Sequence, residues 1–313
     1  MKKILLVADI PGWALDTIAT SMINSLNGSF KFTKIYSSQY RRGMNKCFDE
    51  TYFMQWNDFI GKGDPSDFTA LITSHNYYLL HHSTSRQIIP KLKKVATSSL
   101  ELYKKILELN SNVHYCPHGV DEKLFIKTDY PLRDKFIVGH VGQKLSANAF
   151  LDRAPYDMKG VKFVFNHVKE LLKNHPKIEF KTNHKTPTNA LPLEKMPEFY
   201  QDIDVQLCTS FREGTPFPAL ESASTGRALI STRVGCVPEI IKHGENGLLV
   251  DSFNNIEEAK RTAEQIVEYI LFLNDNRDIC KQMGEKNRIE IEKNWTWDVV
   301  SKNYFSLFGE ENK

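Results

Sequence analysis

Ser210–Val250 reads SFREGTPFPALESASTGRALISTRVGCVPEIIKHGENGLLV, and its pattern indicates the fold class. Glycine and proline near its start favour a loop. A helix is predicted from about Pro218, because proline lacks the N–H group that the first helical turn leaves unbonded. Gly226 fits the left-handed position just beyond this helix. Apolar strands are predicted at Ala228–Ser231 and Gly247–Val250. Such alternation of helix and strand is typical of an α/β fold with a parallel sheet.

Two acidic residues accompany this loop and helix. Glu213 is expected on the loop, and Glu221 about one turn inside the helix. The amino end of a helix favours an anion such as a diphosphate, through its free N–H groups and its dipole. The two carboxylates would then accept hydrogen bonds from hydroxyl groups on either side of the diphosphate, as in a nucleotide sugar. The alternatives are that Glu213 only interacts with the helix dipole and that Glu221 is a solvated helix residue.

The α/β alternation continues through the rest of the second half of the chain. It starts with the strand-like FIVGHVG from Phe136 and ends with long helices at Ile256–Leu273 and Asp278–Glu292. The other elements predicted from apolar periodicity are a helix at Val161–Leu172 and strands at Lys177–Lys181 and Asp204–Cys208.

The first half of the chain begins a separate α/β series. Ile4–Ala8 is a short apolar strand, and Trp13–Leu26 follows it with apolar residues at helical spacing. Further strands are predicted at Phe32–Tyr36, Tyr52–Gln55, Ala70–Thr73, Lys94–Thr97 and Val113–Cys116.

The length of 313 residues favours two domains. The charged, proline-bearing stretch 118–135 is interpreted as the linker, so the predicted domains are 1–130 and 131–296. Two Rossmann-like domains in one chain usually leave a cleft that faces the carboxyl ends of both sheets, where ligands bind.

The composition excludes several classes of protein. The 41 lysines and arginines nearly balance the 38 acidic residues, so no global field demands nucleic acid or an acidic partner. Five cysteines without CxxC or Cys/His ligand spacing indicate a reduced, cytoplasmic compartment. The opening MKKILLVADIPGW has too short an apolar run for a signal peptide and is predicted to be a strand. No apolar stretch approaches the roughly 18 residues of a membrane span, so any membrane contact would be peripheral.

The loop after the first strand argues against a dinucleotide cofactor. ADIPGWALD contains one glycine where the NAD or FAD fingerprint needs three. That glycine, Gly12, would let the backbone approach phosphates or an acceptor, although it can also serve the turn alone.

Ser210–Val250 resembles the donor-site signature of the GT-B glycosyltransferases of family 4, which are retaining nucleotide-sugar enzymes. The shared pattern is a glutamate, seven residues, a second glutamate, small residues with a glycine, a strand, a glycine-bearing loop before a glutamate, and Asn-Gly before a final strand. CPHGVDEKLF is similar to the family's segment at the end of the first domain, with His118 where asparagine is usual. MKG at 158–160 resembles the Lys-Gly that opens a helix facing the diphosphate. WTWDVVSKNYFSLF resembles the final helix, so 297–313 is expected to pack back on the first domain.

The resemblance implies a GT-B fold, with two Rossmann-like domains facing across a cleft, and a transferase of class EC 2.4 in glycan biosynthesis. The enzyme would move a sugar from a UDP- or GDP-sugar to an acceptor hydroxyl with retention of configuration, without a metal or another cofactor. Glu213 would contact the sugar hydroxyls and Glu221 the ribose. Lys159 would bind the diphosphate, since a cation at a helix start is unfavourable unless an anion lies between them, or it is a plain surface lysine. His75 would lie near the outer hydroxyl of the sugar, or it is simply a packed or surface histidine.

The other donor-site residues would supply positive charge or backbone. Relatives carry an arginine after the first glycine turn of the second domain, whereas Gly142 is followed by Gln143 here. Either Lys144 or Arg153 would replace that arginine. The backbone that lines the sugar and diphosphate would come from Gly214, Thr215, Pro216 and Phe217.

Two groups of residues invite a metal interpretation that we do not adopt. The acids of Asp202-Ile203-Asp204 precede an apolar strand, so Asp204 is expected at the strand edge and Asp202 at a helix end. The histidines at 75, 81 and 82 have no further Cys or His at ligand spacing.

The first domain is expected to bind the acceptor, which would be a glycan, a lipid-linked molecule or another hydroxyl compound. Its basic residues fit peripheral contact with the inner face of a membrane, contact with nucleic acid, or plain solvated helix faces. They are Arg41, Arg42, Lys46, Lys91, Lys93, Lys94, Lys104 and Lys105. The alternatives to sugar transfer are a nucleotide-sugar epimerase or phosphorylase of the same fold, and a non-catalytic nucleotide-sugar-binding module.

Overall fold

The computed structural model describes residues 1–55, 57–73, 83–143, 158–185 and 191–309, and the chain divides into two compact units. Unit 1 contains Met1–Gly119 and Trp295–Lys313, and unit 2 contains Val120–Asn294. The sequence placed the division later, at residue 130. Residues 120–130 lie with unit 2, where the Ser224 hydroxyl donates to the Phe125 carbonyl at 2.8 Å.

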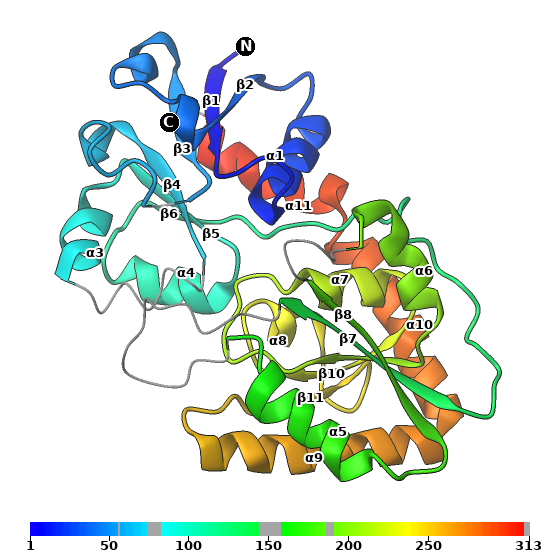
Figure 1. The fold of residues 1–313 in the computed structure, drawn as a ribbon. Coiled ribbons are helices and arrows are strands. Elements are labelled where there is room, and N and C mark those ends of the chain that lie inside the picture. Colours follow the sequence, from blue (N-terminus) through cyan, green and yellow to red (C-terminus); the bar gives the residue numbers. More distant parts are fainter. Residues whose placement is uncertain (56, 74–82, 144–157, 186–190, 310–313) are drawn as a thin grey trace. The chain divides into compact units, whose positions relative to one another are not determined.

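Unit 1 is built on a six-stranded parallel sheet with the order β2-β1-β3-β4-β5-β6 (Figure 1). Its strands are β1 (Lys3–Ala8), β2 (Lys31–Tyr36), β3 (Glu50–Phe53), β4 (Thr69–Ile72), β5 (Lys94–Thr97) and β6 (Val113–Tyr115). Its helices are α1 (Ala14–Ser25), α3 (Ser83–Ile88), α4 (Leu100–Leu107) and α11 (Trp297–Phe308). The continuous apolar run of β1 follows from burial on both faces, as is usual for parallel strands.

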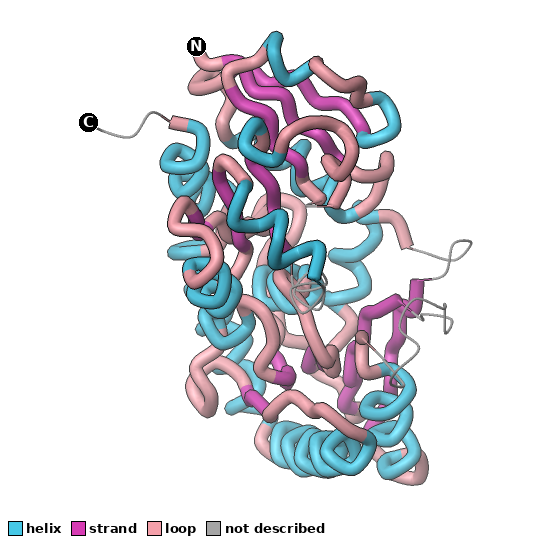
Figure 2. The backbone as a smooth tube through the Cα atoms, turned by 90° about the vertical axis from the view of Figure 1, so that its left-hand side faces the viewer, coloured by secondary structure: helices cyan, strands magenta, loops and turns pink. Residues whose placement is uncertain are grey.

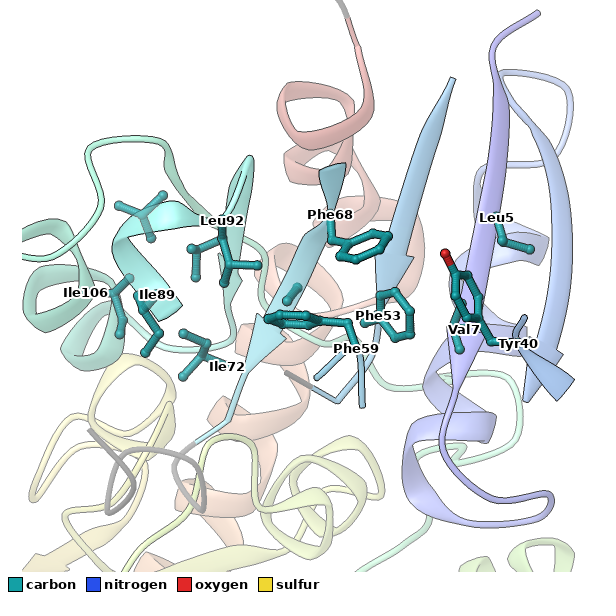
Figure 3. Close-up of a cluster of buried hydrophobic side chains, with 13 residues drawn as sticks. Leu5, Val7, Tyr40, Phe53, Phe59, Phe68, Ile72, Ile89, Leu92 and Ile106 are labelled. Carbon is teal, nitrogen blue, oxygen red and sulfur yellow. The ribbon is translucent and has the colours of Figure 1, made fainter. Parts of the chain in front are cut away.

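Aromatic side chains form much of one core of unit 1. Figure 3 shows Phe53, Phe59 and Phe68 close together, with Tyr40 beside them. The rings of Phe53 and Phe68 lie 5.2 Å apart in the edge-to-face arrangement that aromatic quadrupoles favour. This cluster joins β3 and β4 to the segment between them.

Helix α11 completes unit 1, although it follows unit 2 in the chain. It packs on α1 (Figure 1). The ring of Phe308 lies 5.7 Å from that of Phe30 and 5.5 Å from that of Tyr52. The buried Lys94 ammonium donates to the carbonyl of Leu307 at 2.7 Å. A carbonyl that the end of a helix leaves without an intrahelical partner is thereby satisfied.

Unit 2 contains a five-stranded parallel sheet with the order β11-β10-β9-β7-β8. Its strands are β7 (Phe136–Gln143), β8 (Ile178–Lys185), β9 (Val205–Cys208), β10 (Ala228–Thr232) and β11 (Leu248–Val250). The chain passes from β7 to β8 on one side and then to β9 on the other. Ligands of open parallel sheets bind at the carboxyl ends of strands where the strand order reverses in this way.

Helices flank the sheet of unit 2. A π-helical turn, Val161–Phe165, continues into α5 (Asn166–Leu172), and the other helices are α6 (Met196–Gln201), α7 (Phe217–Ser224), α8 (Val237–Ile240), α9 (Ile256–Asp275) and α10 (Arg277–Asn294). Helix α5 packs against α9, and α7 packs against α10 (Figure 1). Figure 2 shows the strands of each sheet side by side, with helices on their flanks. None of the helices in the described ranges has the length and apolar character needed to span a bilayer.

Candidate functional site

Residues 209–216 form a loop that leaves the carboxyl end of β9 and leads into α7. Strands β9 and β7 pair in parallel, so this loop begins where the strand order reverses. Hydrogen bonds from neighbouring segments fix its backbone. They are, donor first, Thr232 Oγ1 to Ser210 O at 2.6 Å, Ser252 Oγ to Phe211 O at 2.9 Å, and the amides of Phe211 and Cys236 to Met158 O and Gly214 O, each at 3.0 Å.

The loop brings Glu213 to Lys159. The Lys159 ammonium lies 2.5 Å from Glu213 Oε1, and the Ser210 hydroxyl donates to the same oxygen at 2.8 Å. The Glu213 side chain is 6% exposed and the Lys159 side chain 25% exposed. The carboxylate is therefore held inside the protein, while the lysine side chain is partly exposed.

Gly160 allows Lys159 to approach β9 closely. Gly160 has a φ of +64°, and a Cβ there would lie 1.9 Å from the carbonyl oxygen of Thr209. A side chain at this position is excluded both by the left-handed backbone and by this contact. The π-helical turn begins directly after Gly160, so the glycine sets the direction in which the chain leaves Lys159.

Helix α7 begins at Phe217, one residue before the predicted start, and Gly226 takes the expected left-handed conformation after it, with a φ of +79°. The segment before the helix contributes no side-chain cap, because its N-cap residue is Pro216. Glu221, 8% exposed, accepts a hydrogen bond of 2.6 Å from the fully buried Tyr200 hydroxyl. Burial, together with the charge of Glu221, raises the pKa of Tyr200 well above its usual value, so this hydroxyl keeps its proton.

The other predicted donor-site residues are placed as follows. A Cβ on Gly142 would lie 3.7 Å from the Cβ of Lys159, so this strand residue borders the lysine. Gly214 accepts from the Cys236 amide, and Thr215 links it to the start of α7. Gly12 lies in unit 1, has a φ of +75° and donates its amide to Asp16 at 2.9 Å, which is a turn role. His75, Lys144 and Arg153 lie outside the described residues.

The acids at 202 and 204 lie at the end of α6 and directly before β9, as predicted, and both have structural partners. Asp202 caps the end of α6 and forms an exposed ion pair with Lys181 at 2.6 Å. The buried Asp204 carboxylate accepts from the Ile137 amide at 2.7 Å and from Arg277 at 3.0 Å. Within the described ranges, no group of three or more acidic, His or Cys residues is arranged to hold a metal ion.

Sequence reasoning missed Ser210 and Tyr200, which contact the two glutamates. Ser210 is three residues before Glu213, and a hydroxyl on the same short loop is a signal that local sequence offers. Tyr200 lies 21 residues before Glu221 on α6, so only the packing of α6 against α7 brings it there.

Comparisons with known proteins agree with this picture. The family model described as "Glycosyl transferases group 1" matches residues 172–289. Spore coat protein SA of Bacillus subtilis (strain 168) is 29% identical over 149 residues, which are 47% of this chain and 37% of that protein. D-inositol 3-phosphate glycosyltransferase of Corynebacterium diphtheriae is 29% identical over 119 residues, which are 38% of this chain and 26% of that protein. The matches thus span well under half the length of each relative.

The whole chain is similar in fold to a solved structure. Sucrose-phosphate synthase from Thermosynechococcus elongatus matches with a TM-score of 0.73 over 98% of both chains, at 11% sequence identity. Because this identity is low, the likeness concerns the fold, which has an α/β sheet in each unit.

Proposed function

We propose that this chain, whose residues 172–289 match the group 1 glycosyl transferases and whose fold is GT-B, transfers a sugar from a nucleotide-sugar donor to an acceptor hydroxyl. The observation that carries the proposal is the pair of Lys159 and Glu213 at the carboxyl ends of the strands where the order reverses. The donor would be a UDP- or GDP-sugar, and no catalytic metal would be needed.

A bound diphosphate would take the place of Glu213 as the partner of the Lys159 ammonium. In the structure the Lys159 ammonium neutralises Glu213. A diphosphate carries more negative charge than one carboxylate and would attract the ammonium of this partly exposed side chain. Glu213 would keep the Ser210 hydrogen bond and accept a further one from a sugar hydroxyl, while Glu221 would accept from the ribose.

The same groups would stabilise the transition state. The bond between the anomeric carbon and the diphosphate oxygen breaks, and a bond from that carbon to the acceptor oxygen forms on the same face. The departing phosphate oxygen takes the acceptor's proton. Negative charge grows on the diphosphate during this step, so the fixed positive charge of Lys159 and the amino end of α7 would stabilise the transition state more than the ground state.

A thermal-shift screen against UDP, GDP, ADP and their sugars tests donor binding. Stabilisation by one nucleotide sugar would identify the donor, and stabilisation by none would contradict the proposal. Turnover of the donor without any acceptor would favour the epimerase or phosphorylase, and binding without turnover would favour the non-catalytic module. Loss of activity in EDTA with recovery in Mn²⁺ would contradict the metal-independent mechanism.

We propose that unit 1 binds the acceptor and contacts the cytoplasmic face of a membrane peripherally. Helix α4 supports this, because it exposes Leu100 and Leu107, at 42% and 46%, on the helix that carries Lys104 and Lys105. Apolar and basic side chains on one helix are typical of binding to an anionic lipid surface. Flotation with liposomes that contain anionic lipid, at low salt, tests this; failure to float would contradict it.

A further inference from the structure

Hydrogen bonds connect strand β8 to the backbone of Lys159. His184 Nε2 lies 2.9 Å from His140 Nδ1, and His140 Nε2 lies 3.0 Å from the Thr209 hydroxyl oxygen. The Thr209 hydroxyl donates to the carbonyl of Lys159 at 2.8 Å. His140 and Thr209 are both buried, with 1% and 0% exposure. Strands β7 and β8 and the loop after β9 therefore contribute to the position of one peptide group.

The direction of each hydrogen bond in this series follows from the Lys159 carbonyl at its end. A carbonyl oxygen can only accept, so Thr209 uses its one hydroxyl hydrogen on Lys159, and its oxygen accepts from His140 Nε2–H. Burial, aided by the charges of His184 and Lys159, lowers the pKa of His140 to about 3. The neutral ring thus has a bare Nδ1, which accepts from His184 Nε2–H.

The same histidine packs on the turn that follows Lys159. The ring of His140 stacks on Phe165 with centroids 4.1 Å apart and an angle of 26° between the planes. Phe165 ends the π-helical turn, and its amide donates to the Gly160 carbonyl at 2.8 Å. Thr209 contacts this segment twice, through its hydroxyl on Lys159 and through its own carbonyl against Gly160.

We propose that His140, oriented by His184, is a positioning residue of the diphosphate site: through the Thr209 hydroxyl it holds the Lys159 backbone where the lysine ammonium meets the diphosphate. This rests on the proposed function. The ammonium stands at the end of a long flexible side chain, so a fixed backbone limits the conformations that must be lost on binding. The histidines themselves touch no substrate atom in this role.

The test compares binding of nucleoside diphosphates with binding of the corresponding nucleosides by calorimetry. Thr209→Val removes the hydroxyl at nearly constant volume, and Thr209→Ser keeps it. Thr262→Val is the matched control, because Thr262 is also a buried threonine whose hydroxyl donates to a backbone carbonyl, that of Asp251. The dissociation constant of UDP or GDP should rise about tenfold in Thr209→Val and stay within about twofold in the other two variants. Uridine or guanosine affinity should be unchanged, because neither nucleoside carries a phosphate.

Two variants of His140 test the link to the histidine. The amide of His140→Gln can still donate to Thr209, whereas His140→Leu cannot. His140→Gln should bind the diphosphate more tightly than His140→Leu, with nucleoside affinity alike in the two. Nitrogen chemical shifts of the unmodified protein should show His140 protonated at Nε2 and bare at Nδ1 from pH 5 to 8, and His184→Ala should disturb this pattern.

The possible failures are distinguishable. If the unmodified protein binds UDP or GDP and Thr209→Val binds it equally well, the positioning role is wrong while the proposed function stands. Equal losses of nucleoside and diphosphate affinity in Thr209→Val would show general damage and also overturn the role. Failure of the unmodified protein to bind any nucleoside diphosphate would overturn the proposed function together with this inference.

Discussion

Lys159 and Glu213 are a residue pair with separate expected tasks, charge stabilisation and sugar binding. Lys159→Ala should lower kcat/KM about 10²- to 10³-fold, because a fixed charge that meets developing charge in the transition state contributes about this much. Lys260→Ala is the control, since Lys260 forms an ion pair with Glu257 at 3.3 Å that is exposed on α9. Steady-state kinetics with the donor identified in the screen would measure both variants. Full turnover by Lys159→Ala would remove Lys159 from the site.

The burial of Glu213 gives the same pair a second consequence, for stability. Lys159→Met should lower the free energy of unfolding by about 3 kcal/mol, because it removes the positive charge of Lys159 from beside a buried carboxylate. Adding Glu213→Gln should recover most of that loss, since the charge is then gone, but it should not recover activity. Urea unfolding of the two single variants and the double variant measures the coupling. Additive losses would show that the ion pair does not stabilise Glu213.

Tyr200 is expected to hold Glu221 for the ribose. Tyr200→Phe removes the donor of the 2.6 Å hydrogen bond and should cost about 1 kcal/mol of stability. UDP or GDP should bind several-fold more weakly, because the carboxylate loses the hydrogen bond that Tyr200 donates to it. Tyr269→Phe is the control, since its hydroxyl accepts only a surface hydrogen bond from Gln265. Unchanged nucleotide affinity in Tyr200→Phe would limit Tyr200 to a packing role.

The buried His118 should make the free energy of unfolding sensitive to acid. Burial lowers its pKa from 6.5 to about 4. Between pH 6.5 and 4, His118 is therefore protonated in the unfolded chain and neutral in the folded chain. The stability is therefore complete above about pH 6.5 and falls as the pH drops toward 4. His118→Asn should reduce the loss of unfolding free energy between pH 7 and 5.5 by about 1 kcal/mol, and His167→Asn serves as the control. An unchanged pH dependence in His118→Asn would contradict the shift.

At the residue scale, sequence could identify candidates but not their partners. The spacing of Glu213 and Glu221, the Lys-Gly at 159–160 and the family resemblance all lie within short stretches. By contrast, His140 and Thr209 are 69 residues apart, and only the pairing of β7 with β9 brings them together. A strand pattern records that a side chain is buried, but not which side chain of another strand faces it.

Among the elements, the start of the π-helical turn depends most clearly on one residue. Gly160→Ala should destabilise the protein by about 3 kcal/mol or more, since a Cβ would overlap the Thr209 carbonyl in addition to straining the backbone. Gly244→Ala provides a matched control: it has a φ of +81°, but the position of its Cβ is open space. The control should cost only the strain, about 1 kcal/mol. Equal losses in thermal or urea unfolding would contradict the predicted clash.

The accuracy of the predicted elements varies with their burial and length. Strand β5 begins and ends as predicted at Lys94 and Thr97, and α9 and α10 lie where long amphipathic patterns placed them. Strand β3 begins at Glu50, two residues before the prediction, because Glu50 is buried and accepts from the Thr69 hydroxyl at 2.5 Å. From sequence alone, an acidic residue suggests an exposed loop, because the partner that allows its burial is not visible. Helices α4 and α6 are short, and propensity alone does not specify them.

At the scale of the whole molecule, the sequence predicts two α/β units but places their division too late. Proline and charge in 118–135 suggest an exposed linker, yet Arg227 is 1% exposed and binds Thr128 Oγ1 at 2.6 Å and the Asp129 carbonyl at 3.1 Å. Composition reveals only that the stretch 118–135 is polar. It does not reveal the partner of Thr128, because Arg227 lies 99 residues away in the sequence. The division at Gly119 therefore depends on a contact that no local pattern contains.

The return of α11 to unit 1 determines the order in which the chain can mature. A ribosome releases Met1–Gly119 first, but α11 is made only after all of Val120–Asn294. The surface of unit 1 that receives Phe308 therefore stays uncovered until all of unit 2 has been synthesised. Unit 1 is thus the part of the chain that is completed last.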